Sequence, residues 1–369
     1  MTMNKTIPIS SPTLTEVEES YLLDAFRSGF SSSLGEYIGR FEADFASFCG
    51  TNYAVAPSNG TTALHLALAA FDVKSGDEVI VPDLTFIATA NSVVYTGAKP
   101  VFADIDPETL CMDPDSFESL ITERTKAVMP VHMYGHPCNM GRINAIAKKH
   151  GIIVIEDAAE AHGAEFEGKK VGSLGDCGAF SFFGNKIVTT GEGGIVTTND
   201  QALYERLKFL RDHAMSKDKR YWHTAVGFNY RMTNLQAALG TAQLTRNDQI
   251  IEKKRAIFDR YEKAFSGVKT IKLNRTAPWA KNVYWMVCME CELFDEKTRE
   301  RFMANLKAAG VDSRPYFYPV SDMPAYNRAN TPNVHAIYKT GINLPSFFDL
   351  DLADVDMIAE KVLVELGKL

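Results

Sequence analysis

The sequence predicts an α/β protein: a large domain built on a sheet with helices on both faces, followed by a smaller α+β domain. From about residue 13 to residue 247, short apolar runs alternate with helical stretches, which is typical of a helix-covered sheet. The apolar runs are continuous rather than alternating, which indicates strands buried on both faces. A chain of 369 residues that is 46% hydrophobic has enough material for two domains.

The elements of the large domain follow in order along the chain. Strands are expected at residues 53–57, 78–81, 99–103, 127–131, 152–155, 179–182 and 194–198. Helices are expected between these strands, notably over residues 61–71 and 140–150.

A charged helical stretch over residues 248–265 is expected to join the two domains. Beyond it, the pattern predicts a strand at 284–288, a helix at 296–309 and a closing helix at 352–366. We therefore predict a large domain over residues 1–247 and a small domain over residues 248–369.

The charge and the N-terminal sequence argue against several classes of partner. The formal net charge of −7 disfavours general attraction to nucleic acid or to anionic membranes. The N-terminus has no apolar signal region, and no uncharged apolar run reaches the roughly 18 residues needed to span a bilayer. We expect no nucleic-acid partner, no membrane partner and a cytoplasmic location.

The sequence also disfavours a metal site. The six cysteines are scattered, and the pair Cys288 and Cys291 has no second pair to complete a metal site. His132 and His136 have the spacing of a helical zinc pair, but Gly135 and a following proline oppose a helix there. We therefore predict reduced structural thiols, structural histidines and no bound metal.

The segment Pro57-Ser-Asn-Gly-Thr-Thr-Ala-Leu follows a strand and opens a helix. The backbone N–H groups at Gly60 and Thr61 therefore meet at the positive end of a helix, which suits a phosphate. The alternative is an ordinary turn capped by Asn59 or Thr61.

Glu156 and Asp157 stand where the apolar strand 152–155 ends, which is a favoured position for sites in open α/β sheets. Acids in this place resemble the metal-binding strand of an ATPase, although the phosphate loop of such an enzyme is absent. The other interpretation is a counter-charge for a protonated pyridine nitrogen.

Residues 178–194, Gly-Ala-Phe-Ser-Phe-Phe-Gly-Asn-Lys-Ile-Val-Thr-Thr-Gly-Glu-Gly-Gly, place Lys186 in an apolar, glycine-flanked stretch. Desolvation can hold such an amine partly neutral, as Schiff-base chemistry requires. Ser181 can supply a hydroxyl group to a phosphate. Taken alone, a lysine such as Lys186 is more often a solvated surface residue, but the phosphate turn and Asp157 together favour the functional interpretation.

These segments in this order resemble the DegT/DnrJ/EryC1/StrS sugar aminotransferases. The resemblance extends over nearly the whole chain, through Gly227-Phe-Asn-Tyr-Arg-Met-Thr-Asn, Ser313-Arg-Pro-Tyr-Phe-Tyr-Pro and Gly341-Ile-Asn-Leu-Pro-Ser. It implies a pyridoxal 5'-phosphate (PLP)-dependent transferase of fold type I, with a large mixed-sheet α/β/α domain. It also implies a homodimer whose active sites lie between the subunits.

The resemblance also implies roles for individual residues. Lys186 would form the Schiff base with PLP. Gly60, Thr61 and Ser181 would hold the cofactor phosphate, and Asn229 would reach the same phosphate from the partner chain.

Three further residues would surround the cofactor ring. Asp157 would pair with the ring nitrogen, and Phe86 would stack on the ring; core packing is the alternative for Phe86. Glu160 stands where many relatives carry glutamine, near the ring hydroxyl.

The implied reaction moves an amino group from L-glutamate, which becomes 2-oxoglutarate, to a nucleotide-linked keto sugar used for surface polysaccharide such as the O-antigen of lipopolysaccharide. The similarity favours the 4-keto-6-deoxy branch and GDP-4-keto-6-deoxy-D-mannose. A related 3-dehydratase has histidine in place of Lys186, so the lysine favours transamination. Arg220, Arg314 and Tyr318 are candidate substrate contacts, with a solvated turn as the alternative for Arg220. A UDP- or dTDP-linked sugar, or a non-catalytic PLP-binding regulator, remain the alternatives.

Overall fold

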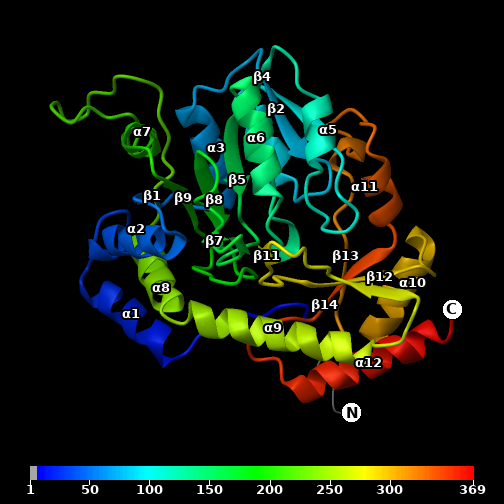
Figure 1. The fold of residues 1–369 in the computed structure, drawn as a ribbon. Coiled ribbons are helices and arrows are strands. Elements are labelled where there is room, and N and C mark those ends of the chain that lie inside the picture. Colours follow the sequence, from blue (N-terminus) through cyan, green and yellow to red (C-terminus); the bar gives the residue numbers. More distant parts are fainter. Residues whose placement is uncertain (1–5) are drawn as a thin grey trace.

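A seven-stranded mixed sheet forms the centre of the large domain, as the computed structural model of residues 6–369 shows (Figure 1). Its strand order is β1-β9-β8-β5-β4-β2-β3. The strands are β1 (Tyr53–Val55), β2 (Glu78–Pro82), β3 (Lys99–Ala103), β4 (Thr125–Val128), β5 (Ile153–Asp157), β8 (Cys177–Ser181) and β9 (Gly194–Thr198). Only β9 runs opposite to its neighbours, and the other neighbouring pairs are parallel. The predicted α/β class and its mixed sheet are confirmed.

Helices cover both faces of this sheet because successive strand residues point to opposite sides. The helices of the large domain are α1 (Glu16–Arg27), α2 (Glu36–Cys49), α3 (Gly60–Ala70), α4 (Ala88–Tyr95), α5 (Pro114–Ser119), α6 (Met140–His150), α7 (Gln201–Arg211) and α8 (Asn234–Leu244), with the short 3-10 helix η1 (Met133–Gly135). In β2, Ile80 joins the apolar cluster beneath α2, α5 and α6, whereas Val79 and Val81 join the cluster beneath α3, α4 and α7.

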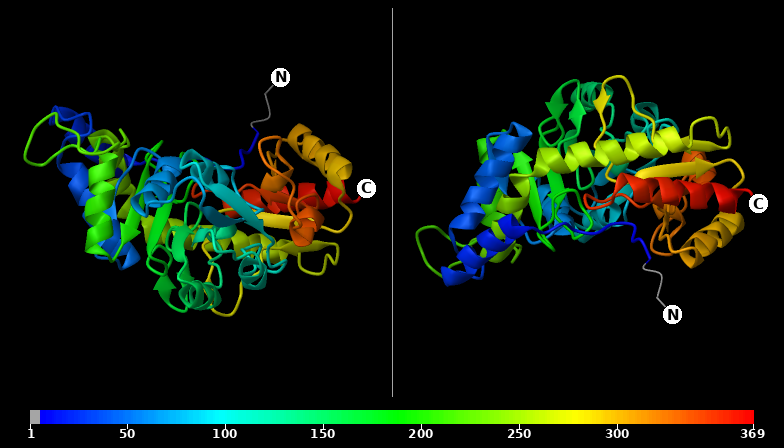
Figure 2. Two further views of the ribbon diagram at one scale, coloured as in Figure 1. Left: turned by 90° about the horizontal axis from the view of Figure 1, so that it is seen from above. Right: turned by 90° about the horizontal axis from the view of Figure 1, so that it is seen from below.

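The long helix α9 (Asn247–Ala264) leads from the large sheet to a second, four-stranded antiparallel sheet (Figure 1). This second sheet has the order β10-β12-β14-β13. Its strands are β10 (Ile271–Leu273), β12 (Val287–Cys291), β13 (Arg314–Pro315) and β14 (Gly341–Leu344), accompanied by α10 (Glu296–Ala308), η2 (Val320–Asp322), α11 (Pro332–Ile337) and α12 (Leu352–Leu366). Helices α9 and α12 lie side by side along this sheet (Figures 1 and 2). The sheet and these helices enclose a separate apolar core.

Two features cross the predicted domain division. A small sheet pairs β11 (Ala280–Lys281) with β6 (Glu165–Phe166) and β7 (Lys169–Lys170) of the large domain. Near the N-terminus, Ile7 pairs with Val311 of the C-terminal region. The division at residue 247 agrees with the position of α9, and it stays a prediction.

Most predicted elements are present with boundaries shifted by one to three residues. The strand expected at 284–288 begins only at Val287, because Tyr284 has a positive φ of 49° that extended backbone does not adopt. The amphipathic helices α1 and α2 were not among the predicted elements. In α1, a reciprocal cap between Thr15 and Glu18 supports the first turn.

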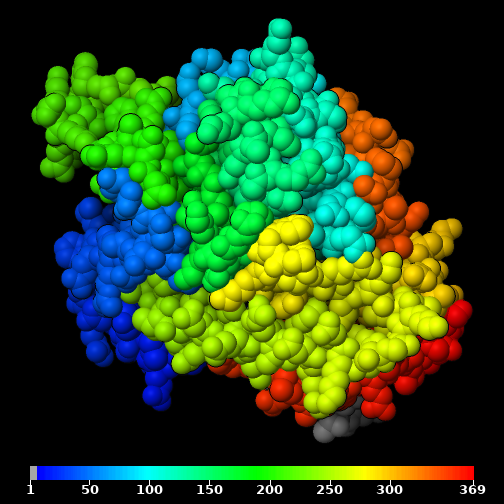
Figure 3. Space-filling model, viewed as in Figure 1, coloured from blue at the N-terminus to red at the C-terminus, as the bar shows by residue number. Residues whose placement is uncertain are grey.

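The fold brings several strand ends to one edge of the large sheet. Since β1 and β8 both run antiparallel to β9, the carboxyl ends of β1, β8 and β5 meet at that edge. Beside this part of the molecule, the loop that follows α7 projects away from the body (Figures 1 and 3). Among residues 6–369, no helix combines the length and the apolar character needed to cross a bilayer.

Candidate active site

A cavity of about 490 Å³ opens where the parallel strands end. The last residues of β5 and β8 reach it, and α3 begins at its wall. All but one of the residues predicted to serve catalysis or cofactor binding line this cavity: Gly60, Thr61, Phe86, Asp157, Glu160, Ser181 and Lys186.

The first turn of α3 offers two free backbone donors. Asn59 caps the helix, since its Oδ1 accepts the N–H of Thr62 at 2.9 Å and Thr62 Oγ1 accepts the N–H of Asn59 at 3.1 Å. The N–H groups of Gly60 and Thr61 have no protein acceptor within residues 6–369. The cap proposed as the alternative for this turn therefore exists, and it leaves an anion site beside it.

Ser181 completes this cradle from the end of β8. A Cβ atom at position 60 would lie 2.6 Å from the Ser181 Cβ, so only glycine allows the helix start to approach the strand so closely. The hydroxyl group of Ser181 accepts the N–H of Phe183 at 3.3 Å, and its own proton stays available for an oxygen atom in the cavity.

Glu156 and Asp157 point to opposite sides of β5. The Glu156 carboxylate is fully buried and accepts three backbone N–H groups from the loop at 172–175, and its Oε2 lies 2.9 Å from the Nε2 of His132. Its role is structural. Asp157 instead faces the cavity, where its Oδ2 accepts the hydroxyl proton of Thr89 at 2.8 Å. Burial raises the pKa of Asp157, and a cationic group in the cavity would offset that penalty.

Lys186 lies in the cavity with its amine between an aromatic ring and a carboxylate. Its Nζ is 3.9 Å from the ring centre of Trp285 and 3.8 Å from Glu160 Oε1. The side chain is 11% exposed, which excludes the alternative of a solvated surface lysine. Burial lowers the pKa of Lys186, in the direction that favours a nucleophilic amine.

Phe86 is 55% exposed and lines the cavity, so it is not a core residue. Its ring centre lies 5.9 Å from that of Phe317, at an angle of 59°. The two rings form an apolar wall that suits the face of a planar heterocycle.

The structure does not bring the remaining predicted residues into this cavity. Asn229 and Arg220 are exposed on the projecting loop after α7. Arg314 pairs with Asp312 on the small domain. Tyr318 is 40% exposed, and its hydroxyl group accepts a hydrogen bond from Arg299. Their contacts with substrate or cofactor stay predictions.

Several residues that line the cavity were not predicted from the sequence, among them Thr89, Trp285 and Phe317. Thr89 lies several residues beyond the end of β2. Trp285 lies in a segment that was predicted to be a strand, and Phe317 precedes the predicted substrate residue Tyr318. A hydroxyl residue one helical turn after Thr85 was the available signal for Thr89. Trp285 and Phe317 come from the C-terminal third of the chain, where spacing carries no information about the cavity.

The predicted structural roles of the histidines and cysteines agree with the structure. Both ring nitrogens of His132 and of His136 have protein hydrogen-bonding partners, and η1 between them is a single turn with Tyr134 in a left-handed conformation. All six cysteines are buried and free. No group of potential metal ligands forms a cluster within residues 6–369.

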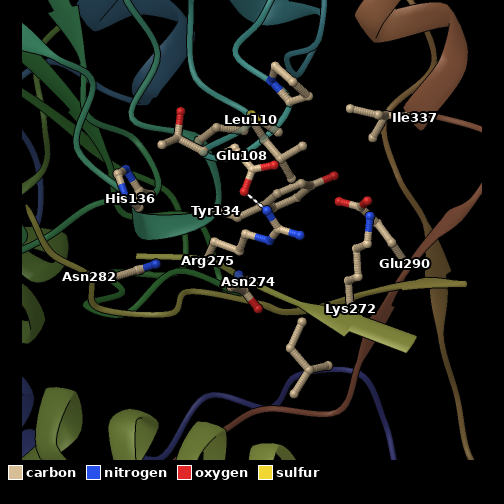
Figure 4. Close-up of a pocket in the computed structure, with 14 residues that line it drawn as sticks. Glu108, Leu110, Tyr134, His136, Lys272, Asn274, Arg275, Asn282, Glu290 and Ile337 are labelled. Carbon is tan, nitrogen blue, oxygen red and sulfur yellow. Dashed lines mark ion pairs between the residues drawn. The ribbon is translucent and has the colours of Figure 1, made fainter. Parts of the chain in front are cut away.

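A second, smaller cavity of about 140 Å³ lies between η1 and the start of the small domain (Figure 4). Glu108 forms an ion pair with Arg275, and the charges of Lys272 and Arg275 oppose that of Glu290. These charges balance, and the amide of Asn274 is used in backbone hydrogen bonds. This cavity has no free charge to select a ligand.

The donors of the larger cavity fit pyridoxal phosphate. Two free N–H groups and a hydroxyl group suit the phosphate, and the buried Asp157 carboxylate suits a protonated ring nitrogen. Phe86 suits the ring face, and the Lys186 amine suits the aldehyde. Glycine at position 60 lets the Ser181 hydroxyl group lie close to the start of α3, because a Cβ atom there would collide with Ser181.

Comparison with known proteins agrees with this geometry. The model of the DegT/DnrJ/EryC1/StrS aminotransferase family matches residues 12–363. The GDP-perosamine synthase of Caulobacter vibrioides is 46% identical over 95% of this chain and 96% of its own length, and that of Escherichia coli is 44% identical over 97% and 98%. A solved structure, a putative sugar aminotransferase of Streptococcus pneumoniae in its PMP form, is 28% identical, with a TM-score of 0.94 over 98% of this chain and 99% of the other.

Proposed function

The chain belongs to the DegT/DnrJ/EryC1/StrS aminotransferase family, and on that premise we propose that it converts GDP-4-keto-6-deoxy-D-mannose to GDP-perosamine with L-glutamate as the amino donor. It is a PLP-dependent sugar-nucleotide aminotransferase of fold type I. The observation that carries the proposal is the cavity in which Lys186, Asp157 and the free donors of α3 meet. The high identity to GDP-perosamine synthases supports the choice of sugar.

When bound, pyridoxal phosphate supplies an aldehyde that carries the amino group and a protonated ring that accepts an electron pair. Lys186 Nζ would hold that aldehyde covalently in the resting enzyme. Once the donor has taken its place, the free amine of Lys186 would act as the general base and acid that moves a proton from the amino-bearing carbon of the donor to the cofactor. In the second half-reaction the same amine runs these proton movements in reverse.

The other cavity residues hold the cofactor in one position and orientation relative to Lys186. Gly60, Thr61 and Ser181 bind the phosphate, so the cofactor stays fixed while its covalent partner changes. The Asp157 carboxylate, which accepts the Thr89 hydroxyl proton, keeps the ring nitrogen protonated. Phe86 covers one face of the ring and excludes water there.

We also propose that two copies of the chain share their active sites. Large apolar side chains are exposed on α1 and on the projecting loop after α7: Leu22, Leu23, Phe26, Tyr221, Trp222 and Val226. Both segments lie on the left side of the molecule in Figures 1 and 3, α1 at its lower end and the loop at its upper end. Exposed large apolar side chains are typical of interfaces. In such a dimer the loop would bring Asn229 to the partner's phosphate site and Arg220 to the partner's substrate. Arg314 and Tyr318 stay candidate substrate contacts from the small domain, and the cytoplasmic location stays a prediction.

The experiment uses purified protein loaded with pyridoxal phosphate. Incubation with L-glutamate should release 2-oxoglutarate, and addition of GDP-4-keto-6-deoxy-D-mannose should give a 4-amino sugar detected by mass spectrometry. UDP- and dTDP-linked 4-keto sugars serve as competitors and should react much more slowly. Preferred turnover of one of them would replace the proposed substrate, and no release of 2-oxoglutarate would favour a non-catalytic regulator.

The matched control is Lys186→Ala, which should bind pyridoxamine phosphate yet transfer no amino group. Borohydride reduction of the loaded wild-type protein, followed by peptide mapping, should label Lys186. Near-normal turnover by Lys186→Ala, or label on another lysine, would contradict the assignment.

A further inference from the structure

The two carboxylate oxygens of Glu160 are held differently. Oε2 accepts the backbone N–H of Tyr134 at 2.8 Å. Oε1 has no hydrogen-bond donor within residues 6–369 and lies 3.8 Å from Lys186 Nζ. The side chain is only 4% exposed and lines the cavity. One oxygen is therefore anchored, and the other faces the reacting amine.

A strained turn orients the backbone N–H group of Tyr134 toward Glu160. Tyr134 has a φ of 52°, a left-handed conformation that costs about 1–2 kcal/mol for a residue with a side chain. Gly135 follows with a φ of 100°, and a Cβ atom there would lie 2.8 Å from the backbone nitrogen of Trp285. The turn is thus held between the Glu160 carboxylate and the Trp285 segment, and the position of Glu160 depends on it.

Lys186 is held from the opposite side. The indole N–H of Trp285 donates to the backbone oxygen of Asn185 at 2.8 Å, which fixes the ring beside the next residue, Lys186. The Lys186 amine lies over that ring at 3.9 Å. A small rotation of the lysine side chain would bring Nζ within hydrogen-bonding distance of Glu160 Oε1.

Burial acts on both partners in opposite directions. It raises the pKa of Glu160 to about 7, and it lowers the pKa of Lys186. The other ionisable groups that interact electrostatically with Glu160 or Lys186 are Asp157, Cys111, Tyr134, Cys288 and His162. Both shifts bring the neutral pair closer in free energy to the ion pair.

We propose that Glu160 is the proton-sharing partner of Lys186, and that the two side chains hold one exchangeable proton between them. In the exchange, the Nζ–H bond of the ammonium breaks, its electron pair stays on nitrogen, and an O–H bond forms at Glu160 Oε1. No other reactant is needed. The use of this proton rests on the proposed function: the amine becomes neutral when it must attack a carbonyl, and Glu160 keeps the proton at the site. A glutamine at this position could accept the Tyr134 N–H, but it could not hold the proton.

The test measures Lys186 in the cofactor-free protein. Trace acetic anhydride acylates neutral amines, and mass spectrometry of the digest gives the pH profile of each lysine between pH 6 and 10. In Glu160→Gln the loss of the carboxylate removes the charge that favours the ammonium, so the Lys186 midpoint should fall by about one pH unit, equal to a tenfold rise in reactivity below the midpoint. Glu160→Asp should restore the profile in part.

Lys254 is the internal control in the same digest. It is buried on α9, where its Nζ donates to the backbone oxygens of Trp285 and Ser346, and its profile should stay unchanged in Glu160→Gln. An unchanged Lys186 profile in folded Glu160→Gln would overturn the proposal.

A reciprocal measurement covers the case in which Glu160→Gln does not fold. Infrared titration of wild type and Lys186→Ala follows the carbonyl band of the protonated acid, and loss of the lysine should move the Glu160 midpoint to higher pH. Identical midpoints would also contradict the proposal. These measurements need neither cofactor nor turnover. If the Lys186 profile shifts in Glu160→Gln but the wild-type protein releases no 2-oxoglutarate, the proton-sharing proposal holds and the proposed function is wrong.

Discussion

Thr89 donates its hydroxyl proton to Oδ2 of Asp157 across 2.8 Å. The Oδ1 of the same carboxylate accepts the backbone N–H of Ala159 at 3.2 Å. Both donors stabilise the charged form of an acid whose pKa burial raises. Thr89 on α4 thus helps to keep Asp157 ionised where a cationic ring nitrogen would meet it.

Asp157→Asn should keep the cofactor phosphate site and lose the counter-charge for the ring. We expect the single-turnover rate of 2-oxoglutarate release from glutamate to fall by about 10²–10³-fold, the usual cost of removing one preorganised electrostatic group. Thr89→Val should cost about tenfold, because it removes one hydrogen bond to the carboxylate. Equal rates in wild type and Asp157→Asn would exclude the proposed pairing.

Glu156→Gln is the matched control for Asp157→Asn. The neighbouring carboxylate accepts N–H groups at both oxygens, so an amide would place its own donors against them. We expect a loss of about 2–3 kcal/mol in the free energy of unfolding, measured by urea denaturation, with little change in the turnover of the folded protein. A catalytic defect as large as that of Asp157→Asn would show that the two acids do not have separate roles.

Gly60→Ala should weaken cofactor binding. The added Cβ would meet Ser181 Cβ at 2.6 Å, so the helix start and the strand must move apart and the phosphate donors lose their geometry. We expect the Kd for pyridoxal phosphate, measured by absorbance titration, to rise by about 10–100-fold, as for the loss of one or two hydrogen bonds to a charged group. Gly39→Ala on α2, where a Cβ has open space, should leave this Kd unchanged.

Lys254 should make stability depend on pH in the alkaline range. Burial lowers the pKa of Lys254 from 10.5 to about 7 in the folded protein. Between pH 7 and pH 10.5 the unfolded chain therefore binds more protons at this residue, so its contribution to stability rises with pH, by a few kcal/mol in total on the order-of-magnitude scale of such shifts. Below about pH 7 the contribution is constant.

The measurement compares wild type with Lys254→Gln by thermal unfolding at pH 7, 8 and 9. The Tm of wild type should rise relative to that of Lys254→Gln as the pH increases. Lys253→Gln, at the neighbouring and only partly buried lysine, should follow the wild-type trend. A constant difference between wild type and Lys254→Gln would mean that the buried amine stays charged throughout.

Shared active sites predict complementation between two chains that carry different defects. Asn229→Ala should weaken cofactor binding in the partner's site, whereas Lys186→Ala destroys its own site. In a mixed dimer of the two variants, one site carries both lesions and the other carries neither. We expect co-expression to restore up to half of the wild-type activity per mixed dimer.

The control is a mixture of Lys186→Ala and Asp157→Asn, two residues that line one cavity of the same chain. Their mixed dimers contain no intact site, so no activity should return. Failure of Lys186→Ala and Asn229→Ala to complement each other, with dimers demonstrated by light scattering, would show that Asn229 does not act across the subunits.

Most residues that the sequence predicts for cofactor binding and catalysis line one cavity, because they lie in local signals. Gly60 and Thr61 mark a strand-to-helix turn, Asp157 ends an apolar strand, and Lys186 follows Ser181 at short range. A parallel sheet brings such strand ends to one edge, so local patterns were enough to place them together.

Other features depended on contacts that spacing does not encode. Glu156 and Asp157 are adjacent at a strand end in the sequence. Because successive side chains of β5 point to opposite faces, Glu156 faces the buried loop and Asp157 faces the cavity. Trp285 was expected within a strand, but the left-handed Tyr284 before it turns the chain toward Lys186.

By itself the sequence determined three parts of the candidate site, a lysine amine, a strand-end acid and a strand-to-helix turn, because each is encoded by neighbouring residues in the chain. Only the tertiary structure decided what surrounds the amine, because Trp285 and Phe317 reach the cavity through the packing of the small domain against the large one. The same packing holds Tyr134 in its strained turn and directs Glu160 toward Lys186. Burial of both groups together, which no local pattern records, raises the pKa of Glu160 and lowers that of Lys186.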